Sequence, residues 1–310
     1  MPETGSGGRL EWLRVAGLTV TTGAFSVLNP LVLVALPLAL LVLVLPARRT
    51  LALVVGLVAG VLALGGNPGT GFWYLERAWA LLLGGWFLAL TLRWPGGRFL
   101  PRGLGAVAGA YGAMALLLRA RPADWAVVDW AVTSRMESGV SLGMQSLRTG
   151  LGPDAISLDL EARLLEAVAL QGLIFPALLG LASLAGLGVA WWLYVRLTRS
   201  PEPGLGPLRD FRFNDQLVWI LILGFLVLLG SSGLWDRLGA NAVVFMGALY
   251  ALRGAAVLLF LTGGVSLLGG ILLLLGMVFV APFLIAGAFV IGLGDTWLNL
   301  RARRGAPSPS

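Results

Sequence analysis

The feature that most constrains this chain is a set of long, uninterrupted apolar segments. They cover residues 31–45, 51–64, 78–92, 217–234 and 265–294. Each is close to or above the length that indicates a membrane-spanning helix rather than a helix of a soluble core. The strands of a membrane β-barrel would instead alternate apolar and polar residues. The sequence therefore predicts an all-α fold, a polytopic helical transmembrane bundle surrounded by a lipid bilayer.

Composition and charge agree with this class. Of the 310 residues, 58% are hydrophobic and 12% are charged, whereas a soluble domain has about 25% charged residues. The net charge is +7, and all 22 basic residues are arginine. Because cationic residues concentrate in the cytoplasmic loops of membrane proteins, we attribute this charge to topology and expect no nucleic-acid partner.

The chain contains no cysteine and no histidine. The first absence removes disulfides, thiolate metal sites and cysteine nucleophiles, and the second removes the commonest general base and metal ligand. The glycine-rich stretches follow no strand and lack the lysine of a phosphate-binding loop. We therefore expect no enzyme activity, no catalytic residue, no cofactor and no metal site.

The chain as a whole is predicted to contain about 8–10 hydrophobic segments. Residues 15–28, 104–118, 167–195 and 242–261 are further apolar segments, and a tight aromatic loop is expected before residue 78. Asn29-Pro30 is a turn signal, and Pro176 predicts a kink. The segment 265–294 would be about 45 Å long as a helix, which exceeds one bilayer core. We expect it to tilt steeply or to break near Pro282, and we prefer the break.

The one sizeable polar stretch covers residues 119–166. Its apolar residues recur every three or four positions: Trp125, Val128, Val132, Met136, Val140, Met144 and Leu147. This spacing predicts an amphipathic helix that lies in the membrane interface or caps the bundle. A second helix is expected to begin after Ser157 as its N-cap. We thus predict one helical membrane domain over residues 12–304, with 119–166 inserted as extramembrane or interfacial helices, between disordered tails at 1–11 and 305–310.

Arginine positions predict the orientation. With the N-terminus in the cytoplasm, the outside loops contain only Arg77 and Arg237. The inside loops then contain Arg9, Arg14, Arg48, Arg49, Arg93, Arg98, Arg102, Arg196, Arg199, Arg209 and Arg212. This asymmetry is typical of a bacterial cytoplasmic membrane protein. An even number of spans returns the C-terminus to the cytoplasm, so we expect both termini there.

Small residues four apart let helices approach closely. Such pairs occur at Gly56 and Gly60, Gly105 and Gly109, Ala182 and Gly186, and Ala288 and Gly292. Packing within the bundle is the main expectation for them, and contact with another membrane protein is the alternative.

Polar residues inside or at the edges of the apolar segments are the candidate ligand-binding or helix-locking residues. They are Gln171, Asp215, Asn241, Arg253 and Asp295. Ionisable residues within a membrane usually face the protein interior and pair with one another. Interfacial placement is an equal alternative for the two aspartates.

Arg253 lies near the centre of its segment and poses the sharpest problem. Arginine cannot lose its proton, and an unpaired arginine at the middle of a span costs about 2.5–3.5 kcal/mol on insertion scales. We expect its side chain to face the protein interior, with Asp295 as the first candidate partner and Asp236 as the second. The pair would either lock helices together or leave the arginine to attract an anionic substrate.

Several segments together resemble a known family. They are "NPLVLVALPLALLVLVLPARR", "WWLYVRLTRS", "FRFNDQLVWILILG", "LYALRGAAVLLFL" and "GLGDTWLNLRAR". Over residues 12–304 they are similar to the YybS-like family of predicted bacterial membrane proteins, a domain of unknown function. The proline-punctuated opening also resembles, more distantly, the S-components of energy-coupling-factor transporters. The resemblance implies a polytopic inner-membrane protein with a distant kinship to transporters.

Two functions remain open at this point. The first is a small-molecule binding or transport module, with an unknown ligand held between helices by the polar residues. The second is a structural or scaffolding protein that contacts other membrane proteins of the envelope or division machinery. An enclosed polar cavity would favour the first, and an exposed stripe of small residues would favour the second.

Overall fold

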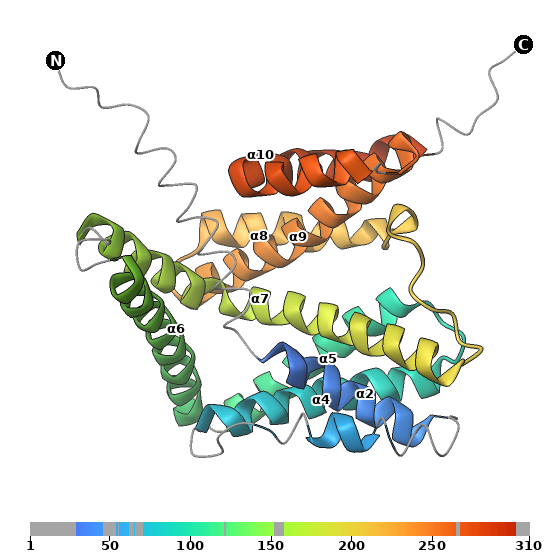
Figure 1. The fold of residues 1–310 in the computed structure, drawn as a ribbon, viewed down its shortest axis with the longest axis horizontal. Coiled ribbons are helices and arrows are strands. Elements are labelled where there is room, and N and C mark those ends of the chain that lie inside the picture. The colour runs from blue at the N-terminus through green and yellow to red at the C-terminus, as the bar shows by residue number, and fades with distance from the viewer. Residues whose placement is uncertain are drawn as a thin grey trace, which may run out of the picture. The chain divides into compact units, whose positions relative to one another are not determined.

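The computed structural model describes residues 29–45, 54, 56–61, 65, 71–120, 122–151, 158–264 and 267–301. All regular structure in this part of the chain is helical, which confirms the all-α class (Figure 1). Five helices are long and apolar enough to cross a membrane: Trp73–Arg93, Phe99–Ala120, Glu166–Thr198, Trp235–Thr262 and Val280–Leu298. The protein is therefore a multi-pass membrane protein.

Some predictions fall outside the described residues. They are the segment 15–28, the Ser157 cap and the two tails. The total of 8–10 segments thus stays a prediction. Contacts divide the chain into two compact units, which we describe separately: an N-terminal unit within residues 22–205 and a C-terminal unit within residues 206–310. The single membrane domain over residues 12–304 also stays a prediction.

Local signals set the start and end of the first helix of the N-terminal unit. The unit contains α2 (Pro30–Val44), α4 (Gly71–Arg93), α5 (Phe99–Ala120), α6 (Pro122–Leu151) and α7 (Leu158–Thr198). The Asn29 side chain accepts a hydrogen bond from the Leu31 amide at 3.0 Å, and Pro30 suits the first helical position. The helix stops before Pro46, because the residue before a proline disfavours helical angles.

Two boundaries differ from the prediction. Helix α4 begins at Gly71, so the end of the expected aromatic loop, including Arg77, is helical. A tertiary contact holds the second turn of α4, since Glu76 accepts a hydrogen bond from the Asn29 amide at 3.1 Å. Helix α7 is one continuous helix of 41 residues, where two separate helices were expected. No glycine or proline separates residues 158–171, and the helix also continues through Pro176.

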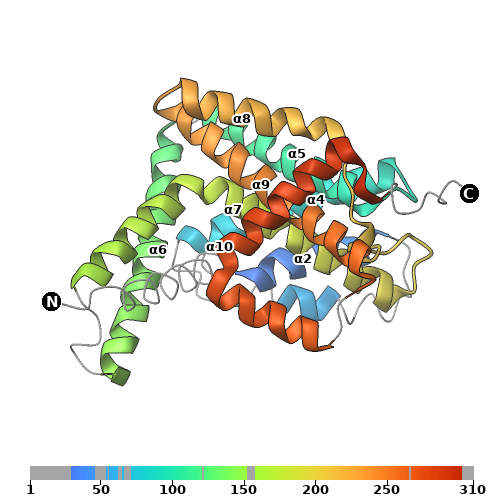
Figure 2. The same ribbon diagram turned by 90° about the horizontal axis from the view of Figure 1, so that it is seen from above.

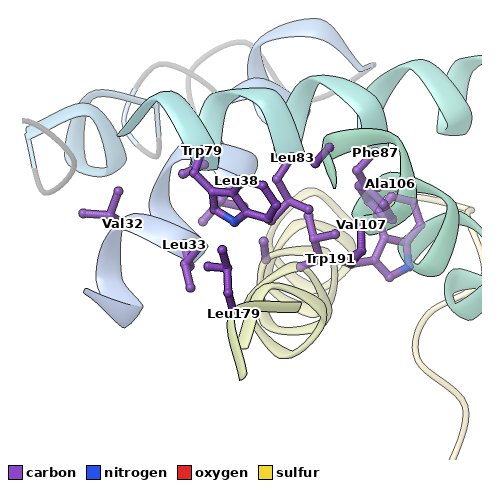
Figure 3. Packing of buried hydrophobic residues seen from close by; sticks show 14 of the residues in the cluster. Val32, Leu33, Leu38, Trp79, Leu83, Phe87, Ala106, Val107, Leu179 and Trp191 are labelled. Atoms are coloured by element: carbon purple, nitrogen blue, oxygen red, sulfur yellow. The ribbon is translucent and has the colours of Figure 1, made fainter. Parts of the chain in front are cut away.

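The core of the N-terminal unit is apolar and aromatic. Trp79, Leu83 and Phe87 of α4 face side chains of α2, α5 and α7 (Figure 3). The Trp79 indole donates to Ser183 Oγ at 2.9 Å, and the rings of Phe87 and Trp191 meet edge to face at 5.7 Å. Each large apolar side chain buried in this way contributes about 1.5–3 kcal/mol relative to an exposed one.

Helix α6 has the predicted buried face. Val132 and Met136 are buried in the core of the N-terminal unit, whereas Trp130 and Leu142 are exposed. The amphipathic helix predicted here is therefore confirmed, and it packs mainly against α7. Its orientation relative to the membrane surface stays a prediction.

Two of the small-residue pairs pack closely in this unit. A Cβ atom at Gly109 of α5 would lie 2.6 Å from the Trp86 ring of α4. At Gly186 of α7, a Cβ atom would lie 3.1 Å from the Leu33 carbonyl oxygen of α2. A Cβ atom at Gly60 would meet nothing within 4 Å among the described residues, so they give no support for a packing role of that glycine.

The C-terminal unit is a helical hairpin followed by a broken helix. It contains η2 (Leu208–Asp210), η3 (Asp215–Leu217), α8 (Val218–Gly230), α9 (Leu234–Thr262) and α10 (Leu267–Leu298). Helices α8 and α9 lie side by side (Figures 1 and 2), and α9 ends at Thr262, which is followed by the capping residue Gly263, whose φ of +74° favours glycine. Helix α10 is interrupted at Val280, with φ −132° and ψ 25°, and Figure 2 shows its two arms at an angle. The predicted break near Pro282 is confirmed, because proline removes the hydrogen bond to the preceding turn and clashes with it.

Candidate functional site

The polar site of the C-terminal unit is built around Arg253 of α9. Its side chain is completely buried, whereas that of the preceding Leu252 is 38% exposed. The guanidinium therefore faces the protein, as predicted. Because this group stays protonated, its burial requires anionic partners within the unit.

Two aspartates from different segments hold this guanidinium. Nε of Arg253 donates to Asp295 Oδ2 of α10 at 3.0 Å, and Nη1 donates to Asp215 Oδ1 of η3 at 2.6 Å. Nη2 also lies 3.0 Å from Asp295 Oδ2, but without the geometry of a hydrogen bond. The predicted pairing of Arg253 with Asp295 is confirmed. The side chain of Asp295 is 3% exposed and that of Asp215 is 40% exposed, so one partner is internal and the other reaches the surface.

A glycine contact between α9 and α10 makes this pairing possible. A Cβ atom at Gly254 would overlap the carbonyl oxygen of Ala288, and one at Gly292 would overlap the carbonyl oxygen of Tyr250. The predicted pair Ala288 and Gly292 is thus a packing contact, since only small residues allow backbones this close. Arg253 directly precedes Gly254, and Asp295 lies about one turn after Gly292, so the crossing places their side chains together.

The segment before α8 forms another wall of the site. The Phe213 ring meets the Tyr250 ring edge to face at 5.0 Å, and the Arg253 guanidinium carbon lies 5.4 Å from the Phe213 ring centre. A cation over an aromatic face is attracted to it. The Asn214 side chain accepts a hydrogen bond from the Gln216 amide at 3.0 Å and so caps η3. This turn holds the next residue, an aspartate, beside Arg253.

The residues after α10 close the site. Asn299 has a left-handed backbone with φ +44°, and its Oδ1 accepts a hydrogen bond from Arg212 Nη2 at 3.0 Å. Arg301 donates to the carbonyl oxygens of Arg209 at 3.2 Å and Phe211 at 2.9 Å. The end of α10 is therefore tied to the segment that carries η2 and η3.

The carboxylate oxygens of the site all have partners, whereas several buried N–H and O–H groups make no hydrogen bond. Asp215 Oδ2 lies 3.1 Å from Arg212 Nη2, and Asp295 Oδ1 accepts from the Leu300 amide at 3.1 Å. With the two contacts to Arg253, every carboxylate oxygen has a partner. Four buried donor atoms have no hydrogen-bond acceptor in the part of the chain that the structure describes: Tyr250 Oη, Arg253 Nη2, Thr296 Oγ1 and Arg301 Nε.

The electrostatics of the site follow from these contacts. Asp215 lies in a turn outside the five spans, and burial alone would raise its pKa. The hydrogen bonds and charges of Arg253 and Arg212 outweigh burial and hold the pKa of Asp215 below its ordinary value. Burial lowers the pKa of Arg301, but an arginine stays protonated at neutral pH. Arg212, Arg253 and Arg301 together with Asp215 and Asp295 thus carry a net charge of +1.

Three residues singled out from the sequence lie away from this site. Asp236 and Asn241 precede Arg253 in α9 by 17 and 12 residues, which corresponds to about 25 and 18 Å along the helix. Asn241 instead donates to the Arg237 carbonyl oxygen at 2.7 Å. Gln171 belongs to α7 of the N-terminal unit. The second candidate partner, Asp236, was therefore a wrong choice, because residues so far apart on one helix cannot contact each other.

Sequence reasoning missed Arg212, Tyr250, Thr296 and Arg301 as members of the site. Arg212 was attributed only to a cytoplasmic loop. The available signal was proximity in sequence, since Arg212 lies three residues before Asp215 and Thr296 directly follows Asp295.

The N-terminal unit also buries charges, but at the ends of helices. Glu76 of α4 lies 3.5 Å from Arg77 and 3.3 Å from Arg135 of α6. Arg102, which was expected in a loop, is buried in the first turn of α5, and its Nη1 lies 3.7 Å from Glu202. These pairs tie neighbouring segments together at the edge of the apolar core. The Arg102 guanidinium carbon also lies 4.7 Å from the centre of the Trp191 ring, at the boundary of the core.

Comparison with protein families places most of the C-terminal part of the chain in a known family. The model of a family described as "Predicted membrane protein (DUF2232)" matches residues 132–296, more than half of the chain. No curated protein and no solved structure matches the chain. The matched residues include Asp215, Arg253 and Asp295. Within the described residues, no group of three or more acidic side chains is placed to hold a metal ion.

Proposed function

The chain belongs to this family of predicted membrane proteins, DUF2232, and from that premise we propose that it is a membrane-embedded small-molecule binding or transport module. The observation that carries the proposal is the sharing of the buried Arg253 between an internal and a surface aspartate. A helix lock needs only one carboxylate. A buried ion pair is also weak evidence for stability, whereas ionisable residues within membranes commonly mark substrate pathways.

We further propose that the module lies in the bacterial cytoplasmic membrane, with both termini in the cytoplasm and without enzyme activity of its own. The arginine distribution supports this orientation. The kinship with YybS-like proteins and with transporter S-components is part of the same proposal. A reporter protein that is active only in the cytoplasm should be active when it is fused after Arg304. If a reporter that is active only in the periplasm is active at that position, the proposed orientation is wrong.

Native purification tests the binding function. Wild type, Arg253→Gln and Arg209→Gln would be purified in mild detergent and analysed by mass spectrometry for small molecules that remain bound. Arg209 is the matched control, because its side chain is 63% exposed and pairs only loosely with Asp210 at 3.9 Å. We expect a small molecule with wild type and Arg209→Gln and its loss from Arg253→Gln. Equal retention by all three proteins, or none by wild type, would contradict the proposal.

Scaffolding is the second candidate, and one observation favours it. Helix α4 exposes Ala78, Gly85 and Ala89 on one face, and within the described part of the chain a Cβ atom at Gly85 would meet nothing within 4 Å. Such a face suits close contact with a helix of another membrane protein. A protein partner that co-purifies with wild type and is lost from Gly85→Leu would support this function. Co-purification that Gly85→Leu leaves intact would count against it.

A further inference from the structure

We propose that Arg212 and Arg253 form a receptor for a phosphate group, and that the Asp215 carboxylate occupies the place of that phosphate in this structure. The inference rests on the proposed function and names its ligand class: inorganic phosphate or a phosphate monoester, soluble or as a lipid headgroup.

The geometry of Asp215 is that of an anion bridging two guanidinium groups. Its Oδ1 lies 2.6 Å from Arg253 Nη1, and its Oδ2 lies 3.1 Å from Arg212 Nη2. Arg253 already has the internal partner Asp295, so Asp215 is its second carboxylate. Asp215 sits in a three-residue turn and is 40% exposed. The Asp215 side chain can therefore move away from the two arginines while α9 and α10 stay in contact.

The charge of the site matches a phosphate once Asp215 moves aside. Arg212, Arg253 and Arg301 then face Asp295 alone, and three positive charges against one negative charge leave +2. A phosphate monoester carries about −1.5 to −2 at pH 7, whereas a ligand carboxylate would carry only one negative charge. The nearby Arg209 and Asp210 are exposed and balance each other.

The unused donors point to the same ligand. Tyr250 Oη, Thr296 Oγ1 and Arg301 Nε are buried without an acceptor among the described residues, and Arg253 Nη2 has only its contact with Asp295 at 3.0 Å, which lacks the geometry of a hydrogen bond. The hydroxyl groups of Tyr250 and Thr296 are neighbours, but their geometry does not make a hydrogen bond. A phosphate group brings three acceptor oxygens, one more than the carboxylate of Asp215, and arginine pairs readily with phosphate through two parallel hydrogen bonds.

Binding of radiolabelled inorganic phosphate to the full chain in detergent tests the proposal. We expect Asp215→Asn to bind phosphate at least tenfold more tightly than wild type, because the competing internal anion is lost; tenfold corresponds to about 1.4 kcal/mol. Arg212→Gln should bind at least tenfold more weakly. Asp210→Asn is the matched control, since it removes the same charge from a neighbouring exposed site, and its affinity should stay within about twofold of wild type.

A second arm separates the two sources of phosphate. Thermal stability would be measured for wild type and Arg212→Gln reconstituted in phosphatidylcholine vesicles with and without phosphatidic acid. Stabilisation of wild type alone by phosphatidic acid, without binding of free phosphate, assigns a lipid headgroup. Binding of free phosphate with the expected order of variants assigns a soluble phosphate.

Three results would overturn the inference: no effect in either arm, equal affinities of wild type, Asp215→Asn and Arg212→Gln, or an equal gain in Asp210→Asn. The native purification separates failure of this inference from failure of the proposed function. If the phosphate experiments fail but a small molecule co-purifies with wild type and not with Arg253→Gln, the binding function stands and only the phosphate assignment is wrong. Misfolding is not expected to explain weaker binding by Arg212→Gln, because the Arg212 side chain is 48% exposed. A gain in affinity by Asp215→Asn cannot come from misfolding, because unfolded protein would bind less phosphate.

Discussion

The two units of this protein bury different kinds of side chain. The N-terminal unit surrounds Trp79, Phe87 and Trp191 with aliphatic residues and keeps its buried charges at helix ends. The C-terminal unit instead buries Arg253 well inside α9 and balances it with carboxylates from two other segments. Apolar packing tolerates the loss of one contact in proportion to the area lost, whereas a buried charge depends on each partner remaining in place.

The largest effect is expected from removing the central ring of the N-terminal unit. Trp191 is 0% exposed, and its indole donates to the Pro203 carbonyl oxygen at 3.0 Å. Trp191→Ala should lower the free energy of unfolding of this unit by roughly 3–5 kcal/mol through loss of packing. Hydrogen exchange should increase in α4 and α7. The adjacent Trp192→Ala, at a 48% exposed position, is the control, and an equal loss there would contradict the assigned core.

The second largest loss of stability is expected from removing a carboxylate that pairs with Arg253 in the C-terminal unit. Asp295→Asn leaves the buried Arg253 with Asp215 alone, so we expect a loss of about 3 kcal/mol, at the lower end of the range for breaking a buried pair. The Tm of the detergent-purified protein measures it. Arg253→Gln should be tolerated better, because glutamine fills the site without a charge. An unchanged Tm for Asp295→Asn would show that the pair is unimportant for stability.

The glycine contact of the same unit should give a smaller loss. Gly254→Ala places a methyl group where the Ala288 carbonyl oxygen lies, so the helices must separate at a cost of about 1–3 kcal/mol. Gly247→Ala, seven residues earlier in α9, adds a methyl group that meets no atom of the described residues within 4 Å. We expect that control to stabilise α9 by about 0.5–1 kcal/mol. Equal thermal shifts in the two variants would exclude a tight crossing at Gly254.

The smallest effect is a dependence on pH that belongs to the C-terminal unit. The pKa of Asp215 is lowered in the folded state, so its contribution to stability is present above the unfolded value of about 3.9 and is lost as pH falls through the lower folded value. Between about pH 5 and pH 3, the Tm of wild type should therefore fall more steeply than that of Asp215→Asn. Parallel curves would show that the contacts of Asp215 with the two arginines leave its titration unchanged.

Features that depend on a few neighbouring residues followed from the sequence. The apolar segments predicted a helical membrane protein, Asn29-Pro30 marked the start of α2, and Pro282 marked the break in α10. The pairing of Arg253 with Asp295 also followed, because a mid-span arginine demands a carboxylate and few are available nearby. These signals are local hydropathy, backbone geometry and charge, which act largely independently of the rest of the fold.

Only the tertiary structure decided how distant segments meet. Asp215 lies 38 residues before Arg253, and nothing in its own neighbourhood distinguishes it from an interfacial aspartate. The N-terminal part of α4 is held through Glu76 by Asn29, which lies 47 residues away in the sequence. Which of many small-residue pairs packs closely depends on the surface opposite, as Gly292 against Tyr250 and the open Gly60 show. The sequence specifies the chemical type of each side chain. The partner of that side chain depends on which distant segments the tertiary fold brings into contact.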